Sequence, residues 1–291
     1  MPQAETILFK RTTIVGPGLL GASIAMGLRE KKISGEIWVW LRDEKKADMC
    51  GKSYWCDRAL IDLKEAIIGS DLVLLCTPVE SILEQLDRIS QWAGEGCIVS
   101  DVGSLKKEIC EKGEQVFENK PSFFIGSHPM AGSEKAGMEF ASADLLSQKH
   151  CIVTPSKNTS EDDINKISML WKRLGMKVSC LGMEEHDEVM SWISHLPHLV
   201  ASSLINTIMS RNPKMIRYCG NGLRDTTRIA AGNPQMWMEI LLGNKENLQQ
   251  GIDDLLKSLE EFREALSNGD RVDLLKMLQS AKDSRDLLDE Y

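Results

Sequence analysis

The sequence TTIVGPGLLGASIAMGLRE, residues 12–30, decides the fold. Its apolar run at 12–15 is typical of a buried strand. This run leads directly into Gly16-Pro17-Gly18-Leu19-Leu20-Gly21, a G-x-G-x-x-G motif, and a helical pattern then continues over 20–30. A strand, a glycine turn and a helix in this order predict the first unit of a dinucleotide-binding domain.

The three glycines of the motif have different tasks. Gly16 permits a tight turn, Gly18 lets the backbone approach a pyrophosphate, and Gly21 lets the helix pack closely on the strand. The pyrophosphate would lie at the positive end of the helix dipole, beside Leu19 and Leu20. A glycine turn without a ligand is the alternative, but the position between a strand and a helix favours dinucleotide binding.

Apolar, β-rich runs alternate with helical patterns through the first part of the chain. The runs lie at 12–15, 37–41, 72–77, 97–101, 123–126, 151–154 and 177–180. Continuous apolar strands that alternate with helices indicate α/β architecture, here a Rossmann-type, doubly wound, mostly parallel sheet.

The pattern changes near Gly182, after which no convincing strand follows. Residues 189–210 resemble a buried helix, and 235–266 and 270–288 resemble amphipathic helices. We therefore predict a dinucleotide-binding domain at 1–182 and an all-helical domain at 183–291.

The composition restricts the class of protein. The chain has 291 residues, 42% of them hydrophobic and 27% charged, which is typical of globular domains. Its net charge of −8 argues against nucleic acid or an anionic membrane as a partner. Eight cysteines show neither C-x-x-C nor zinc-site spacing, which predicts free thiols, a cytoplasmic location and no metal site. The N-terminus lacks a signal-peptide pattern, and 189–210 is too polar for a membrane helix.

The end of the second predicted strand bears on the choice between NAD and NADP. Leu41 occupies the position where an NAD enzyme usually has an acid for the ribose hydroxyls. Arg42 favours NADP, because its guanidinium could pair with a 2′-phosphate, although it could also be an ordinary surface arginine. Asp43 could serve NAD if the strand ends two residues later. Thr77-Pro78 closes another strand at the same edge, as a cofactor contact or as a simple turn.

Two polar motifs follow strands that should end at the binding edge of the sheet. They are Ser100-Asp101-Val102-Gly103-Ser104-Leu105-Lys106 and Ser127-His128-Pro129-Met130-Ala131-Gly132-Ser133-Glu134. The Ser104 hydroxyl and the His128 imidazole could both reach a substrate oxygen beside a nicotinamide, and histidine can take a proton near neutral pH. A loop histidine bonded only to backbone is the alternative for His128.

The uncharged helix predicted at 189–210 carries polar residues at helical spacing. His195 and His198 share a face with Ser194 nearby, which fits either the wall of a wet cavity or satisfied core histidines. Further on, Arg228 could hold a carboxylate, whereas Trp237 fits an apolar core as well as a site.

Together GPGLLG, DVGSLK, SHPMAGSE, ISHLPHLVA and RDTTRIAAGNPQMW resemble the prephenate/arogenate dehydrogenases of the TyrA type. The resemblance covers nearly the whole chain. It implies NAD(P)-dependent oxidative decarboxylation of prephenate to 4-hydroxyphenylpyruvate, of arogenate to tyrosine, or of both, in tyrosine biosynthesis. It also implies that the helical half is a dimerisation domain and that the protein is a homodimer.

The resemblance also implies roles for particular residues. His128 would deprotonate the ring hydroxyl, Ser104 would hydrogen-bond beside it, and Arg228 would hold a substrate carboxylate. The substrate pocket would further include Ser194, His195, His198, Glu134 and Trp237. The absence of an acid at Leu41 departs from many NAD-using relatives and favours NADP.

Two other functions fit parts of the pattern. A β-hydroxyacid dehydrogenase shares the two-domain plan but needs a catalytic lysine on the first long helix of its second domain, and 189–210 contain no lysine. A non-catalytic dinucleotide-binding protein would not require His128, Ser104 and Arg228 together.

Overall fold

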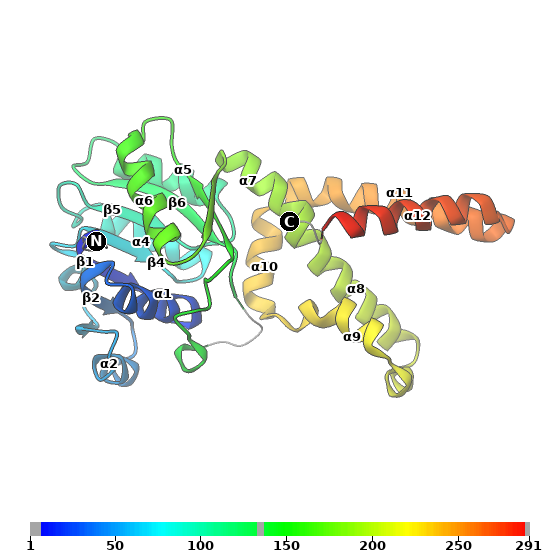
Figure 1. Ribbon diagram of the computed structural model, residues 1–291, viewed down its shortest axis with the longest axis horizontal. Helices are drawn as coiled ribbons and strands as arrows, with labels where there is room; N and C mark the ends of the chain where they lie inside the picture. The colour runs from blue at the N-terminus through cyan, green and yellow to red at the C-terminus, as the bar shows by residue number, and fades with distance from the viewer. Residues whose placement is uncertain (1–6, 133–136, 289–291) are drawn as a thin grey trace, which may run out of the picture.

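The computed structural model describes residues 7–132 and 137–288. It consists of an α/β domain and a set of helices that project from it (Figure 1). The strands are β1 Phe9–Val15, β2 Ser34–Trp40, β3 Arg58–Leu60, β4 Leu72–Leu75, β5 Ile98–Asp101, β6 Phe123–Pro129, β7 His150–Thr154 and β8 Lys177–Cys180. The helices of this domain are α1 Leu19–Glu30, α2 Glu44–Gly51, α3 Leu63–Ile67, α4 Val79–Ile89, α5 Lys107–Phe117 and α6 Glu161–Arg173.

The strands form one sheet in the order β3-β2-β1-β4-β5-β6-β7-β8. Neighbouring strands run parallel except β6 and β7, which are antiparallel. The predicted doubly wound, mostly parallel sheet is therefore confirmed. The strand order reverses between β1 and β4, and ligands bind at this point in such sheets, outside the carboxyl ends of the strands. Strand β3 was missed because its three residues show no apolar run and begin with exposed Arg58.

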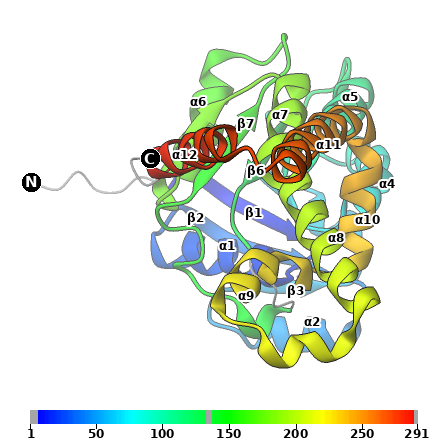
Figure 2. The ribbon, with the colours of Figure 1, turned by 90° about the vertical axis from the view of Figure 1, so that its right-hand side faces the viewer.

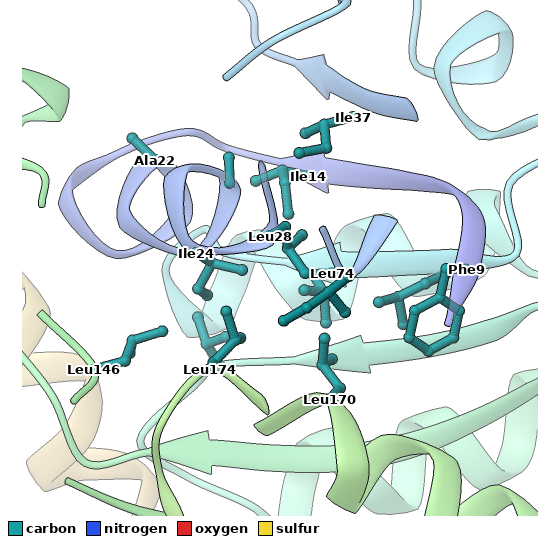
Figure 3. Close-up of a cluster of buried hydrophobic side chains, with 14 of the residues drawn as sticks. Phe9, Ile14, Ala22, Ile24, Leu28, Ile37, Leu74, Leu146, Leu170 and Leu174 are labelled. Carbon is teal, nitrogen blue, oxygen red and sulfur yellow. The ribbon is translucent and has the colours of Figure 1, made fainter. Parts of the chain in front are cut away.

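Apolar side chains cover both faces of the sheet, as alternation along buried strands requires. On one face, Ile14 and Leu74 pack with Leu28 of α1 and Leu170 of α6 (Figure 3). On the other face, the neighbouring strand residues pack on α3, α4 and α5. Two core layers hold the strand ends rigidly, so the loops that follow them present side chains at fixed positions.

The helical part begins after β8 with α7 Met183–Met190, a π-helical turn Ser191–His195, and α8 Leu196–Arg211. It continues with α9 Asn221–Thr227, α10 Pro234–Gly243, α11 Lys245–Asn268 and α12 Arg271–Leu287, with 3₁₀ turns at Pro213–Tyr218 and Arg228–Ala231. A further 3₁₀ turn, Met138–Phe140, lies in the α/β domain between β6 and β7. Helices α11 and α12 form a hairpin that points away from the α/β domain (Figures 1 and 2).

Two expectations about these helices were wrong in part. The stretch 235–266 is two helices rather than one, because the chain turns at Asn244 between α10 and α11. The predicted buried helix at 189–210 is buried on one face only, and only as far as Ala201, whereas Trp192, Ile193, Leu204 and Met209 are exposed. An apolar sequence predicts that a face needs covering but does not say whether the same chain covers it.

Helix α10 joins the two parts of the molecule. Its Ile240 is buried in the apolar layer that includes Ile82 of α4 and Leu105. A side chain at Gly243 would meet Leu105 Cδ1 at 2.3 Å, so glycine there permits close contact. Within the described residues, no helix is long and apolar enough to cross a membrane. All eight cysteines are free.

Candidate active site between the sheet edge and the helices

The glycine motif forms the predicted turn between β1 and α1. Gly16 has a φ of +86°, and a Cβ there would lie 2.5 Å from Thr77 Cγ2. A Cβ at Gly21 would lie 2.6 Å from the Gly16 carbonyl oxygen. Both positions therefore need glycine to keep the turn, the helix and the end of β4 in contact.

Gly18 has a different environment, which fits a ligand. A Cβ at Gly18 would meet nothing within 4 Å. Gly18 is also the N-cap of α1, and no side chain caps this helix end. Leu19 and Leu20 are half-buried in the first turn. An open, uncapped helix N-terminus above a glycine suits the pyrophosphate of a dinucleotide.

The residues after β2 have separate structural roles. Leu41 is buried at 8% exposure and belongs to the core. The Asp43 carboxylate caps α2 by accepting a hydrogen bond from Lys46 N at 3.0 Å. Arg42 is exposed, with its Nη2 atom 3.3 Å from Ser81 Oγ of α4. Thr77 follows β4, and its hydroxyl donates to Gln85 Oε1 at 3.0 Å, while Pro78 precedes α4.

A chain of three polar side chains crosses from β6 to α7. His128 Nδ1 lies 2.9 Å from His186 Nε2, and His186 Nδ1 lies 2.7 Å from Asp187 Oδ1. The Asp187 carboxylate also accepts from the backbone N–H groups of Lys106 at 2.8 Å and Lys107 at 3.0 Å. The carboxylate thus connects the loop after β5 with the first helix of the second part.

The hydrogen-bond network assigns the tautomers of both histidines. A carboxylate with two N–H donors only accepts, so His186 donates to it through Nδ1–H. His186 Nε2 is then an acceptor, and His128 must donate to it through Nδ1–H. The lone pair of His128 therefore lies on Nε2, the atom available to accept a proton from a substrate.

Burial keeps these histidines neutral. Burial lowers the pKa of His128 well below 6.5, and the charges of His186, Lys106 and His195 lower it further. Burial likewise lowers the pKa of His186, only partly opposed by the hydrogen bond with Asp187. Burial alone would raise the pKa of Asp187, but hydrogen bonds from His186 and the two backbone N–H groups bring it below its ordinary value. Asp187 is therefore the charged residue in the hydrogen-bond chain of His128, His186 and Asp187.

A buried ion pair shapes the loop after β5. Lys106 and Asp101 both have fully buried side chains, with Nζ 2.5 Å from Oδ2. The Asp101 carboxylate also accepts from Gly103 N at 2.8 Å and Ser127 N at 3.2 Å. Ser104 is half-buried between these anchors, at the same sheet edge as His128. The sequence predicted Ser104 from its motif but not the ion pair beneath it.

The helical side of the site is built around Trp237. The ring of His198 stacks on it with centroids 3.5 Å apart, and His195 meets it edge-on at 6.3 Å. Asn244 Nδ2 lies 3.0 Å from His195 Nδ1 and 2.7 Å from the Asp187 carbonyl oxygen. Thus the structure brings His195, His198 and Trp237 together and connects them to Asp187.

Three other predicted residues are less closely tied to this cluster. Ser194 is half-buried in the π-helical turn. Arg228 begins a 3₁₀ turn beside α8, and its side chain is exposed. Glu134 lies outside the described residues.

The sequence motifs do not indicate three residues of this site: His186, Asp187 and Asn244. His186 and Asp187 stand in the run Met183-Glu184-Glu185-His186-Asp187-Glu188, whose charge is typical of a solvated helix start. Only the position of this run, directly after the last strand, could have suggested a site. Among the described residues, no cluster of His, Cys, Asp and Glu is suited to a metal ion.

Comparisons with known proteins show the family to which the chain belongs. Residues 24–180 match the model for the prephenate dehydrogenase nucleotide-binding domain, and residues 183–280 match the model for the prephenate dehydrogenase dimerization domain. The chain is 34% identical to prephenate dehydrogenase of Bacillus subtilis strain 168, over 94% of this chain and 74% of that protein. It is 30% identical to cyclohexadienyl dehydrogenase of Zymomonas mobilis, over 96% of both chains.

A solved structure is similar over the same extent. It is prephenate dehydrogenase from A. aeolicus in complex with hydroxyphenyl propionate and NAD⁺. It matches with a TM-score of 0.89 and 30% identity, covering 96% of this chain and 98% of that one.

We expect the buried histidines to make the protein less stable in acid. An unfolded histidine has a pKa of about 6.5, whereas burial lowers that of His195 to about 4. Between these values the unfolded chain binds more protons, so the free energy of unfolding falls as the pH falls. The slope approaches about 1.4 kcal/mol per pH unit for each such histidine. Denaturant unfolding across this range should show a shallower slope for His195→Gln. Exposed His150 is the control, and an equally shallow slope for His150→Gln would contradict the assignment.

We also expect Asp187→Asn to reduce kcat by about 10²–10³-fold. The neutral amide cannot accept from His186 and both backbone N–H groups at once, and it no longer supplies the negative charge that stabilises a protonated His128. Steady-state kinetics measures this loss, and thermal unfolding checks the fold. Asp87→Asn, at an exposed ion pair with Lys112, is the control and should retain kcat. A kcat for Asp187→Asn within about threefold of the unmodified value would remove Asp187 from the mechanism.

Proposed function

Because this chain belongs to the prephenate dehydrogenase family, we propose that it oxidises and decarboxylates prephenate, arogenate or both with His128 Nε2 as the base. The observation that carries the role of His128 is its hydrogen-bond chain through His186 to Asp187. This chain leaves an acceptor on Nε2 of a histidine that is buried and neutral.

The reaction changes the ring carbon that bears the hydroxyl and the carbon opposite it, which bears the ring carboxylate. The ring hydroxyl gives its proton to His128 Nε2 as a carbonyl-type C–O bond forms. A bound nicotinamide would accept the hydride that leaves the same carbon. The bond to the ring carboxylate breaks, CO₂ leaves, and its electrons complete the aromatic ring, while the electrons of the C=O bond return to the oxygen, which takes the proton back from His128. The positive charge that His128 gains is stabilised through His186 by the Asp187 carboxylate.

The remaining predicted residues surround this centre in the proposal. Ser104, at the same sheet edge, would hydrogen-bond near the hydroxyl, and Arg228 would hold a carboxylate. The wall of the pocket would come from Ser194, His195, His198 and Trp237. Support for this wall is the contact of the two imidazoles with the Trp237 ring.

We infer NADP as the preferred dinucleotide. The Asp43 carboxylate is engaged as the cap of α2, and Leu41, at the usual position of the ribose-binding acid, is apolar and buried. Arg42 is exposed beside Ser81 of α4, next to the cofactor edge of the sheet. A guanidinium there suits a 2′-phosphate. The open N-terminus of α1 at Gly18 would hold the pyrophosphate of either dinucleotide.

A homodimer formed through the helical half is also part of the proposal. Several large apolar side chains on these helices are exposed, which is unusual for a monomer. They include Leu204, Met209, Leu256, Leu259, Leu275 and Leu278. Residues 1–182 would carry the dinucleotide and 183–291 the substrate wall and the dimer contact. The eight free cysteines support the cytoplasmic location in this proposal.

The test mixes the protein with prephenate or arogenate and with NAD⁺ or NADP⁺, in all four combinations. We expect reduction of the dinucleotide, fastest with NADP⁺, measured by absorbance of the reduced nicotinamide. We expect His128→Asn to bind the dinucleotide normally and to lose turnover by about 10²–10⁴-fold. His150→Asn, at an exposed site, is the matched control. Turnover that survives in His128→Asn would refute the base, and no reduction in any mixture would refute the function.

A second experiment addresses the dinucleotide alone. We expect Arg42→Ala to reduce kcat/KM for NADP⁺ by about 10- to 100-fold and to leave that for NAD⁺ within about twofold, because only NADP⁺ has the 2′-phosphate. Arg58→Ala, at another exposed position on the same half of the sheet, is the control. An equal loss with both dinucleotides would contradict the assignment of Arg42.

A further inference from the structure

We propose that Asn244 is a positioning residue that fixes His195 as the Nε2–H tautomer, so that His195 donates a hydrogen bond to an oxygen of the substrate. The inference rests on the proposed function for the identity of the substrate. It goes beyond that function by giving Asn244 a task and His195 a defined donor atom.

The orientation of the Asn244 side chain is determined by its neighbours. Its nitrogen lies 2.7 Å from the Asp187 carbonyl oxygen, and a carbonyl oxygen can only accept. Its oxygen accepts a hydrogen bond from Asn247 Nδ2 at 2.9 Å. Exchanging the nitrogen and oxygen of the amide would place two acceptors together and two donors together. The amide therefore points its N–H groups toward Asp187 and His195.

This orientation assigns the proton on His195. Asn244 Nδ2 has a second N–H, and it lies 3.0 Å from His195 Nδ1. His195 Nδ1 must accept, so its lone pair is there and the ring proton is on Nε2. Burial lowers the pKa of His195 to about 4, with the charge of Asp187 opposing this and those of His186 and His198 adding to it. His195 is thus neutral near pH 7, with one N–H at a known atom.

The Nε2 atom of His195 then needs an acceptor. His195 is 1% exposed, and Nε2 is buried without a hydrogen-bond partner among the residues that the structure describes. A buried donor left unpaired costs about 1–3 kcal/mol. The neighbouring Trp237 ring offers no acceptor oxygen. An oxygen of a bound substrate, either a carboxylate or a carbonyl, would satisfy it.

The two histidines of the site therefore present opposite groups. Asp187 and His186 leave a lone pair on His128 Nε2, which suits a hydroxyl that must lose its proton. Asn244 leaves a proton on His195 Nε2, which suits an oxygen that carries negative charge. Because both side chains are neutral imidazoles, only their hydrogen-bond partners make them different.

The tautomer can be observed directly in the unmodified protein. Long-range ¹H–¹⁵N spectra of protein labelled with ¹⁵N-histidine distinguish a protonated ring nitrogen from one with a lone pair. The His195 signals are those lost in His195→Gln. We expect a protonated Nε2 and an unprotonated Nδ1 at about pH 8. The Nδ1–H form or an imidazolium would overturn the proposal. This result does not depend on turnover, so it stands apart from failure of the proposed function.

Kinetics of Asn244→Asp tests the consequence for the substrate. At about pH 8 the new carboxylate would lose the hydrogen bond to the Asp187 carbonyl oxygen, accept from His195 Nδ1–H and leave a lone pair on Nε2. We expect the KM for the substrate to rise about 10- to 100-fold, with little change in the KM for the dinucleotide. Asn212→Asp, which changes an exposed helix cap in the same half of the chain, is the matched control. A KM for Asn244→Asp equal to that of the control would overturn the donor role.

The pH dependence separates this role from simple support of the fold. The carboxylate of Asn244→Asp would raise the pKa of His195, whose other titratable neighbours are His186 and Asp187 on α7, His198 on α8 and His128 on β6. Protonation restores Nε2–H, so the ratio of variant to unmodified KM should fall as the pH is lowered. A ratio independent of pH would indicate a structural effect and overturn the proposal.

Comparing the two acids identifies the substrate oxygen. An equal rise in KM for prephenate and arogenate places a carboxylate at His195, because both acids have one. A rise confined to prephenate places its side-chain keto oxygen there, because arogenate has an amino group at that position.

Discussion

The Asp187 carboxylate is the interaction on which the site depends. It accepts from two consecutive backbone N–H groups at the start of α5 and from His186, while the carbonyl oxygen of the same residue accepts from Asn244. Asp187, a residue of the helical part, thus connects the loop after β5, the hydrogen-bond chain from His128 through His186, and Asn244 beside His195. A buried carboxylate is stable only with such partners, so its charge requires the two parts of the molecule to meet in one arrangement.

Burial and hydrogen bonding have separate effects in this site. Burial removes the charge from the histidines but does not choose which nitrogen keeps the proton. The hydrogen-bond partners determine that nitrogen: the Asp187 carboxylate does so for His186 and His128, and the Asn244 amide does so for His195. The Lys106–Asp101 pair beneath them adds a positive charge that further opposes protonation of His128, and its hydrogen bonds hold the loop that carries Ser104. The same residue type can therefore accept a proton at one position and offer one at another.

Much of the fold could be predicted from the sequence, because buried parallel strands and a glycine turn leave local patterns. The seven predicted strands are present, and Gly16 has the left-handed φ that its turn requires. Contacts between distant segments leave no such pattern. His186 and Asp187 lie in an acidic run, and Asn244 separates two helices that the sequence suggests are one. His128 could be predicted because its motif lies at the carboxyl end of a strand. The identity of its hydrogen-bond partners depends on where α7 begins and packs.

The π-helical turn at Ser191–His195 explains how one helix can serve both halves of the site. In a regular α-helix, residues eight apart such as Asp187 and His195 differ by about 80° around the axis beyond two full turns. A π-helical turn holds more residues per turn, so the rotation between them is smaller and the two come to face the same side. Asn244 contacts the backbone carbonyl oxygen of Asp187 and the ring of His195. The local widening of the helix therefore accompanies an arrangement in which one amide contacts both the backbone of Asp187, whose carboxylate ends the His128–His186–Asp187 hydrogen-bond chain, and the ring of His195.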